Sequence, residues 1–185
     1  KDAFSNSQID SKLWLCQELE SLWSQHNLNA SSRPSEKPII WLYGGWYAVT
    51  ALLLLSRQNM DIKQVRSFDI DPEAETKADL LLENWVIKEW SFKAFTLDVN
   101  DINYHSENYG PAPQIIINTS TEHFEQQKWF EDIPKGCFVA LQNTDMPHEQ
   151  HTNTVESHDQ LSQLYPLETV FFQGQKKFTY PDLSF

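Results

Sequence analysis

One short apolar run constrains this chain more than any other feature of its sequence. Residues 39 to 43, IIWLY, end directly at the glycine pair Gly44-Gly45. Five consecutive apolar residues without polar alternation are typical of a parallel strand that is buried on both faces. A glycine pair at the end of such a strand lets the backbone turn sharply and approach a ligand closely. The run therefore predicts a central strand in an α/β sheet.

Strand and helix patterns alternate along the rest of the chain. The further strands are predicted at residues 65–70, 92–97, 115–117 and 137–141, and helices at 46–59, 71–85, 122–130 and 156–164. Asp71-Pro72-Glu73 marks a helix start, with Asp71 as the N-cap and Pro72 in the first turn. The alternation predicts a doubly wound, mostly parallel α/β sheet. Residues 169–172 and 177–180, separated by Gly174, predict a C-terminal antiparallel hairpin.

An amphipathic helix over residues 11–26 precedes the sheet, followed by a polar loop with two prolines. We therefore expect two parts: an N-terminal helix with its linker, residues 1–37, and the main domain, residues 38–185. The helix is a candidate lid or dimer element, so a homodimer is one expected assembly.

Charge and cysteine content restrict the partners and the compartment. The chain has 14 Lys and Arg against 26 Asp and Glu, a formal net charge of −12. Because phosphates repel such a chain, we expect no nucleic-acid partner and no anionic membrane surface, and a small-molecule substrate instead. Its two cysteines, Cys16 and Cys137, cannot form a disulfide framework, and the apolar runs are too short to span a bilayer. A cytoplasmic location is the expectation.

Distinctive residues follow four of the predicted strands. They are Gly44-Gly45, Asp69, Asp98 and Asn118. In a doubly wound sheet the ligand binds beyond the carboxyl ends of the strands, where these residues fall. Asp69 follows the glycine pair by about 24 residues, and a carboxylate at that spacing can accept hydrogen bonds from both ribose hydroxyls.

Four segments resemble, in this order, class I S-adenosylmethionine-dependent methyltransferases. They are residues 39–48 (IIWLYGGWYA), 67–74 (SFDIDPEA), 95–101 (FTLDVND) and 115–124 (IIINTSTEHF). The resemblance covers roughly residues 38–183. It implies a Rossmann-like fold, S-adenosylmethionine as the cofactor, and methyl transfer to a small-molecule acceptor.

The resemblance also implies residue roles toward the cofactor. Gly44 and Gly45 would form the loop under its methionine part, while Asp69 would hold the ribose. The implied contacts to adenine and to the remaining cofactor surface involve Ile70, Asp98, Val99 and Asn118. The chain departs from the family pattern at Trp46, where a bulky indole follows the glycine pair. That indole would close over the methionine end of the cofactor or block it.

Asn118, Glu122 and His123 form the candidate catalytic group. Methyl transfer needs an acceptor held in line and, where the acceptor is protonated, a base. His123 could be that base, with Glu122 orienting it. The alternative is structural: residues 120–122 begin a helix. His148 and His151 could join His123 around a metal only if their loops converge, and we expect no metal.

Other functions stay open at the level of sequence. An aminopropyl or aminocarboxypropyl transferase would use an equivalent cofactor loop, and an inactive methyltransferase fold could serve as a binding subunit. A nicotinamide-binding fold is disfavoured because the third glycine of its fingerprint is missing near Gly44-Gly45.

Overall fold

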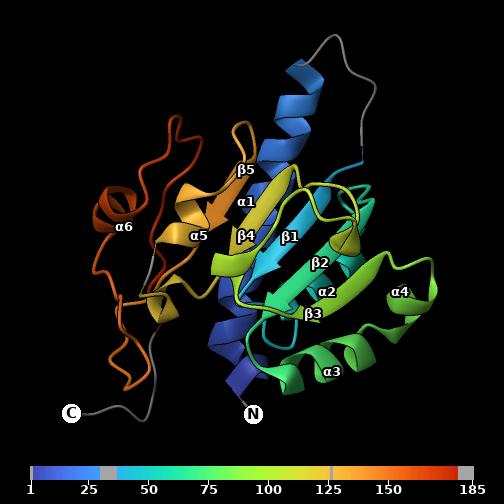
Figure 1. Ribbon diagram of the computed structural model, residues 1–185. Helices are drawn as coiled ribbons and strands as arrows, with labels where there is room; N and C mark the ends of the chain where they lie inside the picture. Colours follow the sequence, from blue (N-terminus) through green and yellow to red (C-terminus); the bar gives the residue numbers. More distant parts are fainter. Residues whose placement is uncertain (1, 30–36, 126, 179–185) are drawn as a thin grey trace.

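The computed structural model describes residues 2–29, 37–125 and 127–178. At its centre lies one five-stranded sheet in the order β3-β2-β1-β4-β5, in which every pair of neighbours is parallel (Figure 1). The strands are β1 (Ile39–Tyr43), β2 (Gln64–Asp69), β3 (Phe92–Thr96), β4 (Ile115–Asn118) and β5 (Phe138–Leu141). The predicted parallel α/β sheet is confirmed, and the apolar run forms its central strand, buried along its whole length.

Six α-helices surround the sheet in the described part of the chain. They are α1 (Asn6–Asn29), α2 (Val49–Arg57), α3 (Pro72–Leu81), α4 (Glu83–Ile87), α5 (Lys128–Glu131) and α6 (His158–Leu164). Short 3-10 helices add η1 (Asp2–Phe4), η2 (Val99–Asp101), η3 (Glu107–Tyr109) and η4 (Thr121–His123). The predicted start of α3 is confirmed: the Asp71 carboxylate accepts a hydrogen bond from the amide of Glu73 at 2.9 Å.

The continuous helix predicted over residues 122–130 is wrong. This stretch divides into η4 and α5. The Glu122 carbonyl accepts hydrogen bonds from the amides of Thr152 and Asn153, at 2.9 and 3.0 Å. Because a helix would have used that carbonyl internally, the packed loop after β5 stops the helix from continuing.

The two faces of the sheet carry two separate apolar layers. Ile40 and Leu42 of β1 face a layer that includes Leu19 of α1 and Leu54 of α2. Successive side chains of a strand point to opposite faces, so Trp41 and the other odd positions of β1 face the second layer. That layer contains Phe68, Trp129 and Tyr165, and is covered by short helices and loops.

The C-terminal hairpin is not confirmed. Residues 169–172 are not a strand, and the second expected strand, 177–180, lies partly outside the described residues. Phe171 contacts Phe138 of β5, and Phe172 packs edge-on against Trp14 of α1, with ring centroids 5.7 and 5.9 Å apart. These apolar residues thus pack through their rings and do not pair as a ladder. The linker segment 30–36 also lies outside the described residues.

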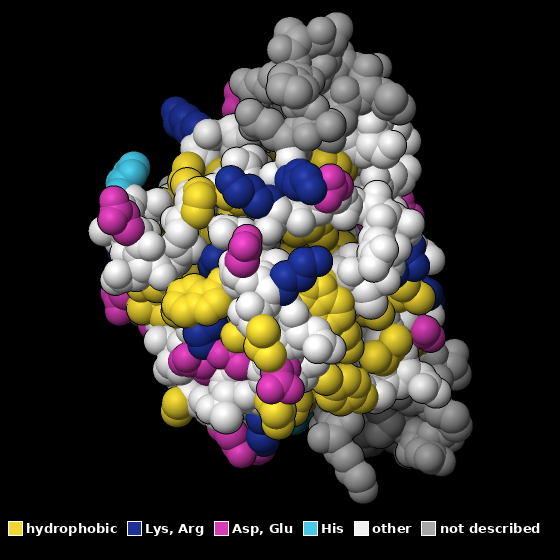
Figure 2. Space-filling view, turned by 90° about the vertical axis from the view of Figure 1, so that its right-hand side faces the viewer, with side chains coloured by type: hydrophobic (Ala, Val, Ile, Leu, Met, Phe, Trp, Pro, Cys, Tyr) yellow, Lys and Arg dark blue, Asp and Glu magenta, His cyan; other side chains and the backbone are white. Residues whose placement is uncertain are grey.

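The surface beside β3 carries exposed apolar side chains among charged ones. Figure 2 shows this side of the molecule, over α3 and α4. Leu80 and Ile87 are both more than 70% exposed, and Trp90 is half exposed. The homodimer expected from the N-terminal helix stays a prediction. No helix in the described ranges is long and apolar enough to cross a membrane.

Candidate active site

The turn after β1 needs both of its glycines. Gly44 has a φ of +58°, which side-chain-bearing residues rarely adopt. A Cβ on Gly45 would lie 2.0 Å from the Ser67 hydroxyl oxygen of β2. The Gly45 amide also donates a hydrogen bond to the Phe68 carbonyl at 3.2 Å. The turn therefore runs directly against the end of β2.

The Asp69 carboxylate connects the two strand ends. Its Oδ2 accepts a hydrogen bond from the Trp46 amide at 2.8 Å, and its Oδ1 accepts one from the Asp71 amide at 3.1 Å. Trp46 has a φ of 45°, an unfavourable value for a bulky residue, so Asp69 stabilises a strained turn. A carboxylate has about four lone-pair directions, which leaves capacity for ligand hydroxyls.

Two apolar side chains are exposed beside this turn. The Trp46 ring stacks on Tyr47 with centroids 4.7 Å apart and is 39% exposed. Tyr47 in turn accepts a hydrogen bond from Lys77 of α3 at 3.0 Å. Ile70 is 72% exposed directly after Asp69. Neither Trp46 nor Ile70 belongs to the core, and both are accessible to a ligand at the carboxyl edge.

The structure places Asp98 and Val99 after β3, in different environments. The Asp98 Oδ1 accepts hydrogen bonds from the amide and the side-chain nitrogen of Asn100, both at 2.9 Å, and so caps η2. Its second oxygen has no hydrogen-bond partner among the described residues. Val99 is buried at 4% exposure. Asp98 thus has a structural role and one oxygen free for a ligand.

Asn118 ends β4 as a fully buried amide. Its Oδ1 accepts a hydrogen bond from the Ser120 amide at 2.9 Å, while its Nδ2 has no partner among the described residues. The following loop lies over the glycine turn: a Cβ on Gly44 would be 3.1 Å from the Phe124 ring. A buried donor without an acceptor is rare in folded proteins and is consistent with a ligand contact.

Glu122 and His123 lie on η4, next to this loop. Glu122 is 7% exposed, and burial raises the pKa of its carboxyl group. Burial also lowers the pKa of His123, although the Gln150 carbonyl beside its Nδ1, at 3.0 Å, favours the protonated form. The Glu122 Oε1 and the His123 Nε2 are 3.9 Å apart. Burial therefore favours the uncharged form of both side chains.

The loops that carry His123, His148 and His151 converge. The rings of His123 and His151 meet edge-on, with their centroids 4.7 Å apart. The ring centroids of His148 and His151 are 5.0 Å apart. Glu122, His123 and His151 each offer one possible metal-ligand atom, and these three atoms lie within 4.8 Å of one another.

Sequence reasoning missed the polar residues that hold this convergence. The Asn143 side-chain nitrogen donates to the Thr121 hydroxyl at 2.9 Å and to the Asn153 carbonyl at 2.8 Å. The Thr121 hydroxyl itself donates to the Gln142 carbonyl at 2.7 Å. Gln142 and Asn143 directly follow β5, so the signal was the one used at Asp69, Asp98 and Asn118: polar residues at a strand end.

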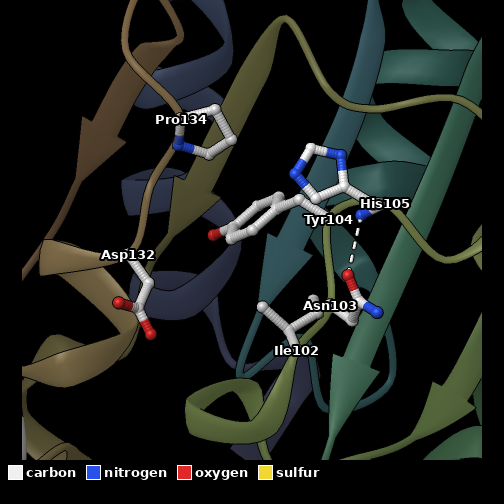
Figure 3. Close-up of a pocket in the computed structure, with 6 residues that line it drawn as sticks. All are labelled: Ile102, Asn103, Tyr104, His105, Asp132 and Pro134. Carbon is white, nitrogen blue, oxygen red and sulfur yellow. Dashed lines mark hydrogen bonds between the residues drawn. The ribbon is translucent and has the colours of Figure 1, made fainter.

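A separate cavity of about 410 Å³ lies between the loop after η2 and the turn before β5. Figure 3 shows Tyr104 at its centre, with Ile102, Asn103 and His105 on one side and Asp132 and Pro134 on the other. Tyr104 stacks on Trp41, in the middle of β1, with centroids 5.3 Å apart. This cavity is therefore on the face of the sheet and not at its carboxyl edge.

The carboxyl-edge residues fit an adenosyl cofactor. A Cβ at Gly45 would displace the Ser67 hydroxyl, Asp69 retains lone pairs, and the buried Asn118 donor is unpaired. These are the features that a close backbone contact, a ribose diol and a polar ligand group require.

No family model and no curated protein matches the sequence. Among solved structures, a candidate sarcosine dimethylglycine methyltransferase from Galdieria sulphuraria matches with a TM-score of 0.54 and 12% identity, over 72% of this chain and 46% of that chain. The CMeT domain of the citrinin polyketide synthase matches with a TM-score of 0.54 and 17% identity, over 78% of this chain and 38% of that chain. This chain thus spans less than half the length of both structures. The fold is that of class I S-adenosylmethionine-dependent methyltransferases, as the sequence resemblance implies.

Proposed function

We propose that this chain binds S-adenosylmethionine at the carboxyl edge of the sheet and transfers its methyl group to a small polar acceptor. The observation that carries the proposal is the hydrogen bond between Asp69 and the Trp46 amide. It joins the acid that ends β2 to the glycine turn after β1. This unit lies beside the carboxyl ends of the neighbouring strands β1 and β4, where the strand order reverses and where such sheets bind nucleotides.

Each proposed contact to the cofactor uses a residue that lies at this edge of the sheet. Asp69 would accept the ribose hydroxyls, and the backbone of Gly44-Gly45 would lie against the methionine part. Exposed Ile70 and the free oxygen of Asp98 would contact the adenine. When bound, S-adenosylmethionine supplies an electrophilic methyl group, so the chain needs only to orient the acceptor and exclude water.

The acceptor side is assigned to Asn118 and His123. Asn118 offers a buried N–H without an internal partner, and Nε2 of His123 has no hydrogen-bond partner among the described residues. One donor and one acceptor beside the glycine turn can hold a polar group in line with the methyl carbon. Positioning of this kind accounts for most of the rate that such a site can supply.

A small acceptor suits the charge of the chain better than a nucleic acid. The formal net charge is −12, and a strongly acidic chain repels the many phosphates of a nucleic acid. The proposal therefore names a small amine, hydroxyl or carboxyl compound.

The test is to identify the product made from the cofactor. The full chain is incubated with S-adenosylmethionine and a panel of small amines, phenols and hydroxy acids, and in parallel with transfer RNA. Mass spectrometry then quantifies the nucleoside products. S-adenosylhomocysteine formed with a small acceptor, at a rate that Asn118→Ala lowers by about a hundredfold, supports the proposal.

Other products of the same incubation would overturn it. Methylthioadenosine would indicate transfer of the aminocarboxypropyl group of the cofactor. S-adenosylhomocysteine formed only with RNA would contradict the acceptor class. Binding of S-adenosylhomocysteine without turnover on any acceptor would indicate an inactive binding subunit.

A further inference from the structure

We propose that Glu122, His123 and His151 bind one divalent transition-metal ion at the carboxyl edge of the sheet. Their ligand atoms lie within 4.8 Å of one another, although His151 is 28 residues beyond His123 in the chain. Two imidazole nitrogens and one carboxylate form a ligand set that zinc and ferrous iron both accept. The inference does not depend on cofactor binding, but it assigns the His123 Nε2 lone pair to the ion, so a bound ion excludes the direct contact from that nitrogen to the acceptor proposed above.

Both imidazoles keep Nε2 available as a metal-ligand atom. The Nδ1 of His123 lies 3.0 Å from the Gln150 carbonyl oxygen, and the Nδ1 of His151 lies 2.8 Å from the Met146 carbonyl oxygen. A carbonyl oxygen only accepts hydrogen bonds, so each Nδ1 carries the hydrogen, and in the neutral ring each Nε2 presents a lone pair. A backbone carbonyl behind the ring is the usual second partner of a metal-binding histidine.

One oxygen of the Glu122 carboxyl group lacks a hydrogen-bond partner. The side chain is nine-tenths buried, and its Oε2 has no partner among the described residues. The nearby cation Lys12 donates a hydrogen bond to Gln8 and acts on Glu122 through its charge. A buried carboxylate with an unbonded oxygen is unfavourable, and a divalent cation would bind that oxygen directly.

The backbone holds the two ligand segments together without a metal. The amides of Thr152 and Asn153 both bind the Glu122 carbonyl, at 2.9 and 3.0 Å. The Asn153 side chain donates to the Phe124 carbonyl at 2.9 Å. His151 is thus fixed beside η4 by its neighbours, and the site is partly organised before an ion binds.

Binding requires only a small closure of the side chains. The Glu122 Oε1 and the His123 Nε2 are 3.9 Å apart. Metal–ligand bonds of about 2.0–2.1 Å place tetrahedral ligand atoms about 3.3 Å apart. Rotation of the exposed His123 ring can supply the difference for this pair, and the other ligand-atom pairs, which lie within 4.8 Å, need a closure of up to about 1.5 Å. Because His123 is partly exposed, a fourth position would face solvent, as in catalytic zinc sites.

Metal titration of the tag-free chain tests the proposal. The protein is dialysed against a chelator and titrated with Co²⁺, monitored by visible absorbance, and then with Zn²⁺ against a chromophoric chelator. We expect one ion per chain with a micromolar or lower dissociation constant. Glu122→Gln, His123→Ala and His151→Ala should each weaken Zn²⁺ binding by at least tenfold to a hundredfold.

His148→Ala is the matched control, since the His148 Nδ1 accepts a hydrogen bond from the Gln150 amide and lies outside the proposed ligand set. The Zn²⁺ affinity of His148→Ala should stay within threefold of the wild-type value. Circular dichroism confirms that each variant is folded, and X-ray absorption of the zinc-loaded wild type should show nitrogen and oxygen ligands only.

Two results would overturn the metal site. One is the absence of Co²⁺ and Zn²⁺ binding below millimolar concentration by the folded wild type. The other is an equal loss of affinity in His148→Ala and His151→Ala. S-adenosylhomocysteine affinity is measured on the same preparations without metal, so a failed metal site with normal nucleoside binding leaves the proposed function standing.

Discussion

The Asp69 carboxylate accepts a hydrogen bond from the Trp46 backbone amide at 2.8 Å, so the acid that ends β2 holds the turn that follows β1. The same side chain accepts a second hydrogen bond from the Asp71 amide. One residue therefore fixes the glycine turn and the start of the loop to α3. In the proposed site, Asp69 both binds the ribose and shapes the surface on which the cofactor lies.

Replacement of Asp69 by alanine should strongly weaken cofactor binding while the sheet stays intact. Loss of charge-assisted hydrogen bonds costs about 2–3 kcal/mol, or about 30- to 150-fold in affinity for S-adenosylhomocysteine. Asp71→Ala is the control, because that change removes only the α3 N-cap, worth about 1 kcal/mol of stability. Equal affinities in the two variants, measured by calorimetry, would remove Asp69 from the cofactor site.

Gly45→Ala should destabilise the chain through one identifiable contact. The new Cβ would lie 2.0 Å from the Ser67 hydroxyl oxygen but 3.3 Å from the Ser67 Cβ. Overpacking of this kind costs about 1–3 kcal/mol. Ser67→Ala removes the hydroxyl, so the double variant should lose less stability than the two single variants added together. Urea denaturation measures all four proteins, and strictly additive losses would show that the contact does not limit the turn.

Glu20 should make the stability of the chain depend on pH. Burial alone would raise its pKa, but hydrogen bonds from Arg57 and Asn59, at 2.7–2.8 Å, outweigh burial and lower it. A lowered native pKa stabilises the fold above the unfolded value of about 4.3, and this contribution disappears as the pH falls through the native pKa.

Glu20→Gln should therefore lower the melting temperature at pH 7 and narrow the difference between pH 7 and pH 3. Asp61→Asn, at the exposed Lys37–Asp61 pair, is the control and should change little. If the melting temperatures of the wild type and Glu20→Gln depend on pH in the same way, the Glu20–Arg57 ion pair does not contribute to stability.

The sequence was sufficient for the sheet because its strongest signals are local. The apolar run at residues 39–43 and the Asp71-Pro72 helix start depend on neighbouring residues, and both have the predicted structure. The helix predicted at residues 122–130 is wrong because the amides of Thr152 and Asn153 compete for the Glu122 carbonyl. That competition depends on a contact between distant segments.

The same distinction applies to the candidate site. The strand-end positions of Asp69 and Asn118 followed from the order of the elements. The hydrogen bond from the Trp46 amide to Asp69 could not be predicted, since it depends on a left-handed turn at a tryptophan. The approach of His151 to Glu122 depends on backbone hydrogen bonds of the loop after β5, which leave no periodic pattern in the sequence.

The most direct test of the central claim is a calorimetric titration of the full chain with S-adenosylhomocysteine, with NAD as the comparison ligand. We expect one S-adenosylhomocysteine per chain with a dissociation constant in the micromolar range, binding at least about 30-fold weaker in Asp69→Ala, and no heat with NAD. A folded wild-type chain that binds no S-adenosylhomocysteine up to millimolar concentration, or that binds NAD more tightly, would contradict the central claim.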